Sequence, residues 1–172
     1  AERTAGLDID RRAEEAVGDG IDAANQVEMP RRPRECVNLL PAERIKRAHC
    51  RSVVGEMHAG FYNLRSALPM NLRARYPGYR VFTGARSDIR RVLTIWNECF
   101  EAYRGRFLFG DQPTLADAMY APVCTRFETY DVTLDEQCEA YKMRILAMPF
   151  MKEWKKAALQ EREELEELDV EF

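Results

Sequence analysis

The chain has 172 residues and a mass of 20.0 kDa, which suits one domain of ordinary size, alone or with extended arms. Apolar residues make up 46% and charged residues 32%, a balance that excludes collagen-like, wholly disordered and disulfide-stapled chains. The formal net charge of −3 is unevenly spread: residues 1–40 carry six basic and nine acidic side chains, and the last twelve residues carry one basic and seven acidic. The body from 41 to 160 is therefore basic and lies between two acidic ends.

Residues 1–40 are rich in Ala, Gly, Asp, Glu, Arg and Pro and contain no aromatic residue. Such a segment buries too little apolar surface to offset its ordering entropy, so we expect an extended arm that is ordered only against a partner. Its acidic start lacks the apolar core of a signal peptide, and the opening at Ala1 rather than Met predicts that something upstream is removed. No stretch approaches the ~20 consecutive apolar residues of a membrane-spanning helix.

The five cysteines are odd in number and none has C-x-x-C spacing. They are Cys36, Cys50, Cys99, Cys124 and Cys138. This usage predicts free thiols in a reducing soluble compartment, either the cytoplasm or an organelle interior after presequence removal. No group of cysteines and histidines has zinc-ligand spacing, and His49 and His58 fall on different faces of one helix, so we expect no metal site.

From Pro41 onward the apolar residues recur at three- and four-residue steps, which predicts helices. The first expected helix covers residues 45–68 and ends at Pro69, and a loop follows from 70 to 84. Its apolar face would be Ile45, His49, Val53, Met57, Phe61, Leu64 and Leu68. Ser87 is expected to cap a second helix that stops at Gly105. Its inner face would be Ile89, Val92, Leu93, Trp96, Phe100 and Tyr103.

A third helix is expected from Thr114 to about Phe127, and two more would end the domain. The first of these two would cover about 134–148 and the second about 150–160. The helix over 134–148 would have on one side Leu134, Cys138, Tyr141 and Ile145. No segment of useful length alternates with a period of two, so no strand is expected. The sequence therefore predicts an all-α bundle over 41–160, preceded by the arm of residues 1–40 and followed by an acidic tail of residues 161–172.

The sharpest local signal is Pro113-Thr-Leu-Ala-Asp117, in which Thr114 and Asp117 have the spacing of a helix capping box. The longer string from Gly110 to Pro122, G-D-Q-P-T-L-A-D-A-M-Y-A-P, resembles the start of the central helix in the C-terminal domain of glutathione transferases. Residues 56–73 are similar to the first long helix and following loop of bacterial-type members, and 149–154 resemble a late helix with the pattern P-x-x-x-x-W. The resemblance covers about 41 to 172 and implies a helical bundle.

A complete transferase of this family begins with a thioredoxin-like domain of about eighty residues. That domain binds glutathione and activates its thiol, yet only forty residues precede Pro41, and they contain no βαβ pattern and no Glu-Ser pair. The resemblance therefore implies no catalytic residue and no cofactor in this chain, with glutathione expected only if a thioredoxin-like domain is supplied elsewhere.

Two groups of residues are candidate sites. By resemblance, the wall of a pocket for the electrophilic substrate would comprise Phe61, Tyr62, Arg65, Met70, Tyr120 and Arg126; the alternative is that several of these are core or interface packing. The second group is an arginine-rich stretch from 65 to 91 with tyrosines between. Its candidate anion-binding residues are Arg73, Arg75, Arg80, Arg86, Arg90 and Arg91, which suit carboxylates of a partner protein or of the acidic tail more than nucleic acid, unless they are simply solvated.

Two functions follow as hypotheses. In the first, the chain is a non-catalytic helical module that serves as a structural or interaction subunit of a larger protein assembly, or forms a homodimer. In the second, it is the electrophile-binding half of a glutathione transferase whose other half lies elsewhere. The absent glutathione site favours the first.

Overall fold

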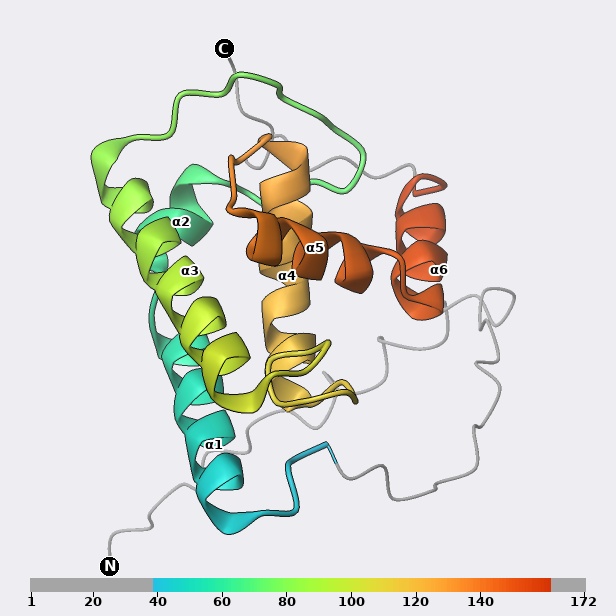
Figure 1. Ribbon diagram of the computed structural model, residues 1–172. Coiled ribbons are helices and arrows are strands. Elements are labelled where there is room, and N and C mark those ends of the chain that lie inside the picture. The colour runs from blue at the N-terminus through green and yellow to red at the C-terminus, as the bar shows by residue number, and fades with distance from the viewer. Residues whose placement is uncertain (1–38, 162–172) are drawn as a thin grey trace, which may run out of the picture. The chain divides into compact units, whose positions relative to one another are not determined.

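The computed structural model describes residues 39–161, so most of the expected arm, including Cys36, and nearly all of the acidic tail lie outside the described residues. The described chain is all-α, as predicted, and contains no strand, only an isolated bridge between Phe107 and Gly110. The helices are α1 (Arg44–Ala59), α2 (Tyr62–Ala67), α3 (Thr83–Tyr103), α4 (Leu115–Thr129), α5 (Glu136–Leu146) and α6 (Pro149–Ala158) (Figure 1).

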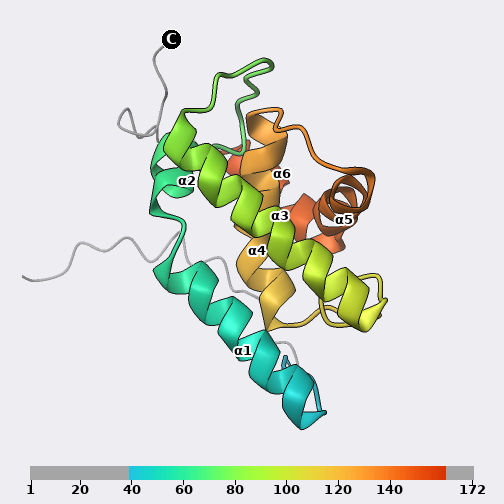
Figure 2. The same ribbon diagram turned by 60° about the vertical axis from the view of Figure 1, so that its left-hand side comes forward.

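The single long helix expected over 45–68 is wrong: the chain breaks it into α1 and α2 (Figure 2). Gly60 adopts an extended backbone, and a Cβ there would lie 2.7 Å from the carbonyl oxygen of Glu56. Phe61 follows in the left-handed region, with a φ of 58°. The bend turns Phe61 and Leu64 into the core, while Ile45 at the other end is 77% exposed. The apolar period therefore continues across a break in the helix.

The second expected helix begins earlier than Ser87 predicted. α3 starts at Thr83, and its first turn is closed by the Arg86 amide, which donates to the Phe82 carbonyl at 3.1 Å. It ends at Tyr103, because Arg104 takes a left-handed conformation. Gly105 has another role, since a Cβ there would lie 2.2 Å from the Cα of Gly110. Its missing side chain lets the tight turn that precedes α4 fold back on itself.

The remaining three helices agree with their predicted ranges to within about two residues. α4 contacts α1 and α5, α2 packs on α3, and α6 packs on α5. Aromatic side chains from three helices meet in the core, where the Trp96 ring lies 4.8 Å from that of Tyr141 and 5.8 Å from those of Tyr120 and Phe127. α4 contributes nine buried residues and lies in the middle of the described helices (Figure 1). No helix within 39–161 is long and apolar enough to cross a membrane.

The segment between α2 and α3 is tied to α4 by its backbone. The Thr129 hydroxyl donates to the Asn71 carbonyl at 2.8 Å, and the Tyr76 amide donates to the Thr129 carbonyl at 2.7 Å. The Asn71 side chain also accepts from the Arg73 and Ala74 amides at 2.9 and 3.0 Å. These bonds hold residues 71–76 as a fixed wall beside the end of α4.

Candidate functional site

The buried carboxylate of Asp117 forms the predicted capping box with Thr114. Asp117 is 2% exposed and accepts hydrogen bonds from the Thr114 amide at 2.7 Å and the Thr114 hydroxyl at 2.9 Å. It also accepts from the Leu108 amide at 3.1 Å and the Tyr141 hydroxyl at 3.0 Å. One carboxylate therefore joins the turn before α4, the start of α4 and α5, and its role is structural.

The six residues of the expected electrophile wall are placed in different environments. Phe61 is 7% exposed, and Tyr120 is fully buried with its ring at right angles to that of Trp96. Burial raises the pKa of the Tyr120 phenol, so the hydroxyl stays protonated. Tyr62 is 74% exposed, whereas Arg65 and Met70 are partly buried. None of these six residues lines any of the three hollows described below.

Arg126, the last member of that group, is held by two backbone carbonyls. Its Nε donates to the Leu68 oxygen at 2.9 Å and one terminal nitrogen donates to the Pro122 oxygen at 3.1 Å. Burial lowers the pKa of the Arg126 guanidinium, and the nearby Arg65 acts in the same direction. Arg126 therefore ties the end of α2 to α4 through two of its N–H groups.

The arginines of the expected anionic-partner patch are divided by the fold. Arg91 pairs with Glu56 through two bonds of 2.7 and 2.9 Å, which joins α3 to α1. This pairing lowers the pKa of Glu56, mainly through the hydrogen bonds from Arg91. Arg80, Arg86 and Arg90 instead line one hollow of about 630 Å³ beside α3 and the segment after α4. Arg73 and Arg75 lie on a different hollow, described next.

We name this second hollow the α6 groove; it has a volume of about 460 Å³ and is formed by three segments far apart in the sequence. Its lining residues are Leu72, Arg73, Ala74, Arg75, Thr125, Glu128, Thr129, Met143, Leu146, Ala147, Met151, Lys152, Trp154, Lys155 and Leu159. A shallower hollow lined by residues 75–80 shares Arg75 with the α6 groove and Arg80 with the hollow beside α3. Basic side chains therefore lie along the segment between α2 and α3.

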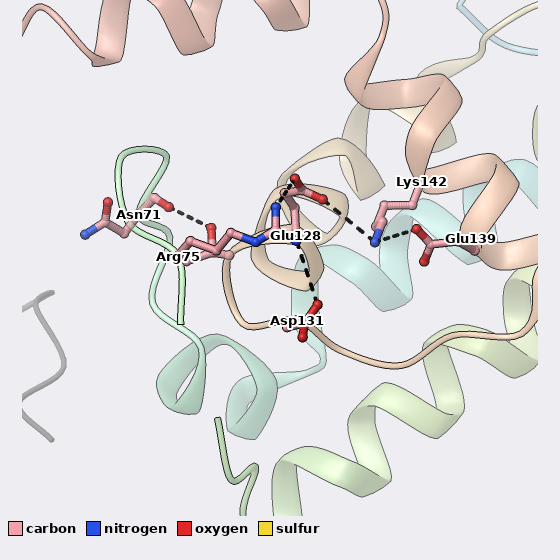
Figure 3. A network of polar contacts seen from close by, with 7 residues as sticks. Asn71, Arg75, Glu128, Asp131, Glu139 and Lys142 are labelled. Carbon is pink, nitrogen blue, oxygen red and sulfur yellow. Dashed lines mark hydrogen bonds and ion pairs between the residues drawn. The ribbon is translucent and has the colours of Figure 1, made fainter. Parts of the chain in front are cut away.

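Figure 3 shows the network of polar contacts that includes Arg75 and Glu128, two lining residues of the α6 groove. Arg75 lies 2.8 Å from Glu128 and 3.8 Å from Asp131, while the buried Lys142 lies 2.9 Å from Glu139 and 3.9 Å from Glu128. Glu128 is therefore shared between two cations, and its charge is balanced within the fold. The α5 and α6 residues of the groove were missed by sequence reasoning, because its walls come from segments that no local pattern connects.

The described thiols and buried phenols are held in their neutral forms. Burial raises the pKa of Cys99 to about 12 and raises the pKa values of Cys50, Cys124 and Cys138 as well. A thiolate is the reactive form of cysteine, so none of these four groups is an activated nucleophile at neutral pH. Within residues 39–161, no cluster of His, Cys, Asp and Glu has the arrangement of a metal site.

Comparison of the sequence with models of known protein families finds a match to one family. The model of the glutathione S-transferase C-terminal domain matches residues 75–157, which include the end of the segment before α3 and nearly all of α3 to α6. No curated protein matches the chain. The matched region contains the capping box, the aromatic core and two walls of the α6 groove. The match confirms the resemblance over residues 75–157: this part of the chain is a glutathione S-transferase C-terminal domain.

Proposed function

We propose that this chain is a non-catalytic glutathione S-transferase-like helical module that acts as a structural or interaction subunit of a larger protein assembly. The observation that carries the proposal is the position of the residues expected to bind an electrophile. Phe61 and Tyr120 are buried in the core, and Arg126 is bound to two carbonyls. The hollows that remain accessible lie elsewhere and are lined by basic and apolar side chains.

Large apolar side chains on the surface support a role in binding another protein. Those at the amino-terminal side of the described chain are Leu39, Ile45, Tyr62 and Phe82, and those at the carboxyl-terminal side are Met143, Phe150, Trp154 and Leu159. Each is between 41 and 77% exposed. Single exposed apolar residues are ordinary, but contiguous ones are typical of interaction surfaces, and Met143, Trp154 and Leu159 line the same groove.

The alternative is that the chain is the electrophile-site half of a transferase whose thioredoxin-like half is missing from it. The exposure of Ile45 and Tyr62 favours this alternative, because family resemblance implies that the first helical segments pack against that domain. Under it, glutathione would be bound by the absent half, and the electrophile wall would be completed only by the second domain.

We expect purified residues 1–172 neither to conjugate glutathione to a generic aromatic electrophile nor to bind a glutathione affinity resin. The physical reason is that thiol activation needs a donor directed at the sulfur, whereas the described thiols and buried phenols are neutral and enclosed. The rate would be compared with that of buffer alone. Turnover well above the buffer rate would overturn the non-catalytic assignment.

We also expect the isolated chain to self-associate at micromolar concentration, because its exposed apolar side chains have no cover from another subunit. Sedimentation velocity over a dilution series measures this directly. The double variant Ile45→Ser and Tyr62→Ser should shift the distribution toward monomer, whereas the control Ser66→Ala, an exposed change on α2, should not. A parent chain that remains monomeric at every concentration would contradict the interaction role.

A further inference from the structure

The α6 groove has an uneven distribution of charge. Arg73 and Arg75 lie on the wall formed by the segment before α3, and Lys152 and Lys155 lie on the wall formed by α6. Glu128 is the one acidic residue among the lining residues, and it is bonded to Arg75 and lies near Lys142. The lining residues thus carry four cations against one carboxylate, and the exposed Lys152 and Lys155 give the α6 wall a positive charge.

The same groove exposes apolar surface. Met143 is 53% exposed, Trp154 is 41% exposed and Leu159 is 56% exposed, and all three are lining residues. Cations beside an apolar floor suit a segment that alternates carboxylates with leucine-sized side chains. A purely anionic ligand would leave this apolar surface in water.

The chain itself supplies such a segment directly after the groove. Residues 162–172 contain six acidic residues and one arginine, with the apolar side chains Leu165, Leu168, Val170 and Phe172 between them. Leu159 lines the groove, and the chain turns there, since the Gln160 amide donates to the Ala157 carbonyl at 2.9 Å. The acidic residues therefore begin close to the groove in the sequence: Glu161 comes two residues after Leu159, and Glu163 and Glu164 come soon after it.

The distances allow this segment to lie back along the groove. The α6 residues of the lining, from Met151 to Leu159, cover roughly 12 Å at the helical rise of 1.5 Å per residue. Eleven extended residues reach up to roughly 36 Å. The segment is thus long enough to pass both Lys155 and Lys152.

We propose that the α6 groove is an interaction surface for acidic, leucine-bearing peptide, and that its occupant is residues 162–172 of the same chain. The carboxylates contact Lys152 and Lys155, and the leucines cover Trp154 and Met143. This contact is formed within one molecule, and it does not depend on whether the protein has an enzymatic or a structural role.

Trp154 provides the readout, because the other tryptophan, Trp96, is fully buried. Acrylamide quenching of tryptophan emission would be compared between the full chain and a variant ending at Glu161. We expect quenching to rise roughly twofold on truncation, in line with the loss of cover over apolar surface. Salt at 1 M, which shortens the Debye length to ~3 Å, should raise quenching in the full chain and leave the truncated chain unchanged. In the background Trp154→Phe, truncation should have no effect.

A second comparison keeps the whole chain intact. Lys152→Glu with Lys155→Glu should reproduce the effect of truncation, and adding Glu163→Lys, Glu164→Lys and Glu166→Lys should restore the low quenching. The matched control Lys156→Glu changes an exposed lysine of α6 that does not line the groove and should have no effect. Equal quenching with and without residues 162–172 would overturn the proposal. A truncation effect that disappears on dilution would also overturn it, because the occupant would then be the tail of a second copy.

Discussion

Asp117→Ala is expected to lower the free energy of unfolding by at least about 3 kcal/mol, because loss of a helix cap costs about 0.5–2 kcal/mol and each buried donor left without a partner costs about 1–3 kcal/mol more. The donors concerned are the amides of Thr114 and Leu108 and the hydroxyl of Tyr141. With a typical total of about 5–15 kcal/mol for a domain, most of the stability margin would be lost. Urea unfolding followed by circular dichroism measures the change.

The matched control is Asp111→Ala, which removes an exposed carboxylate from the same turn. Asp111 accepts one hydrogen bond, from the Arg106 amide at 3.3 Å, so its removal should cost less than about 1 kcal/mol. Asp117→Asn keeps the shape but places an amide group among donors, and it should lie between the control and Asp117→Ala. Equal unfolding free energies for the variants of Asp111 and Asp117 would mean that the buried carboxylate contributes nothing beyond an exposed one.

The second large effect is expected at alkaline pH. Folding raises the pKa of Cys99 from 9.0 to about 12 and also raises those of Cys124 and Cys138, in each case chiefly through burial. A thiol with a raised pKa in the folded state contributes stability that is fully present below the unfolded pKa. That stability is lost as pH rises from about 9 toward the folded pKa, because the unfolded chain releases the proton first. Each such thiol contributes a slope of about 1.4 kcal/mol per pH unit within that window.

Unfolding free energies measured by urea titration at pH 7 to 11, with a thiol-free reductant, should therefore be constant near neutrality and fall steeply above pH 9. Lysines and tyrosines also titrate there, so the informative quantity is the difference between the parent and Cys99→Ala. Since the variant lacks one buried thiol, this difference should shrink by roughly 2 kcal/mol between pH 9 and pH 11, because the slope reaches its full value only above the unfolded pKa. The same pH dependence in both proteins would show that Cys99 ionises equally in the folded and unfolded chains.

Sequence patterns of short range were sufficient for the helical class, the family and the capping box. Leu134, Cys138, Tyr141 and Ile145 repeat with the helical period, and α5 lies where they predict. Thr114 and Asp117 are three residues apart, so their interaction is settled within one helical turn. The periodic signal could not reveal the break at Gly60 and Phe61, because apolar residues keep their spacing through it.

The positions of the candidate site residues were decided by tertiary structure. Arg75 meets Glu128 across 53 residues, and Arg126 meets the Leu68 carbonyl across 58, so no local period connects either pair. The fold pairs Arg75 and Arg91 with carboxylates on helices that the sequence pattern did not associate with them. The sequence by itself thus determined that the chain forms helices and how α4 begins, since those depend on neighbouring residues. Only the packing of α4, α5 and α6 decided which side chains are enclosed and where a groove remains, because each wall of that groove belongs to a different part of the chain.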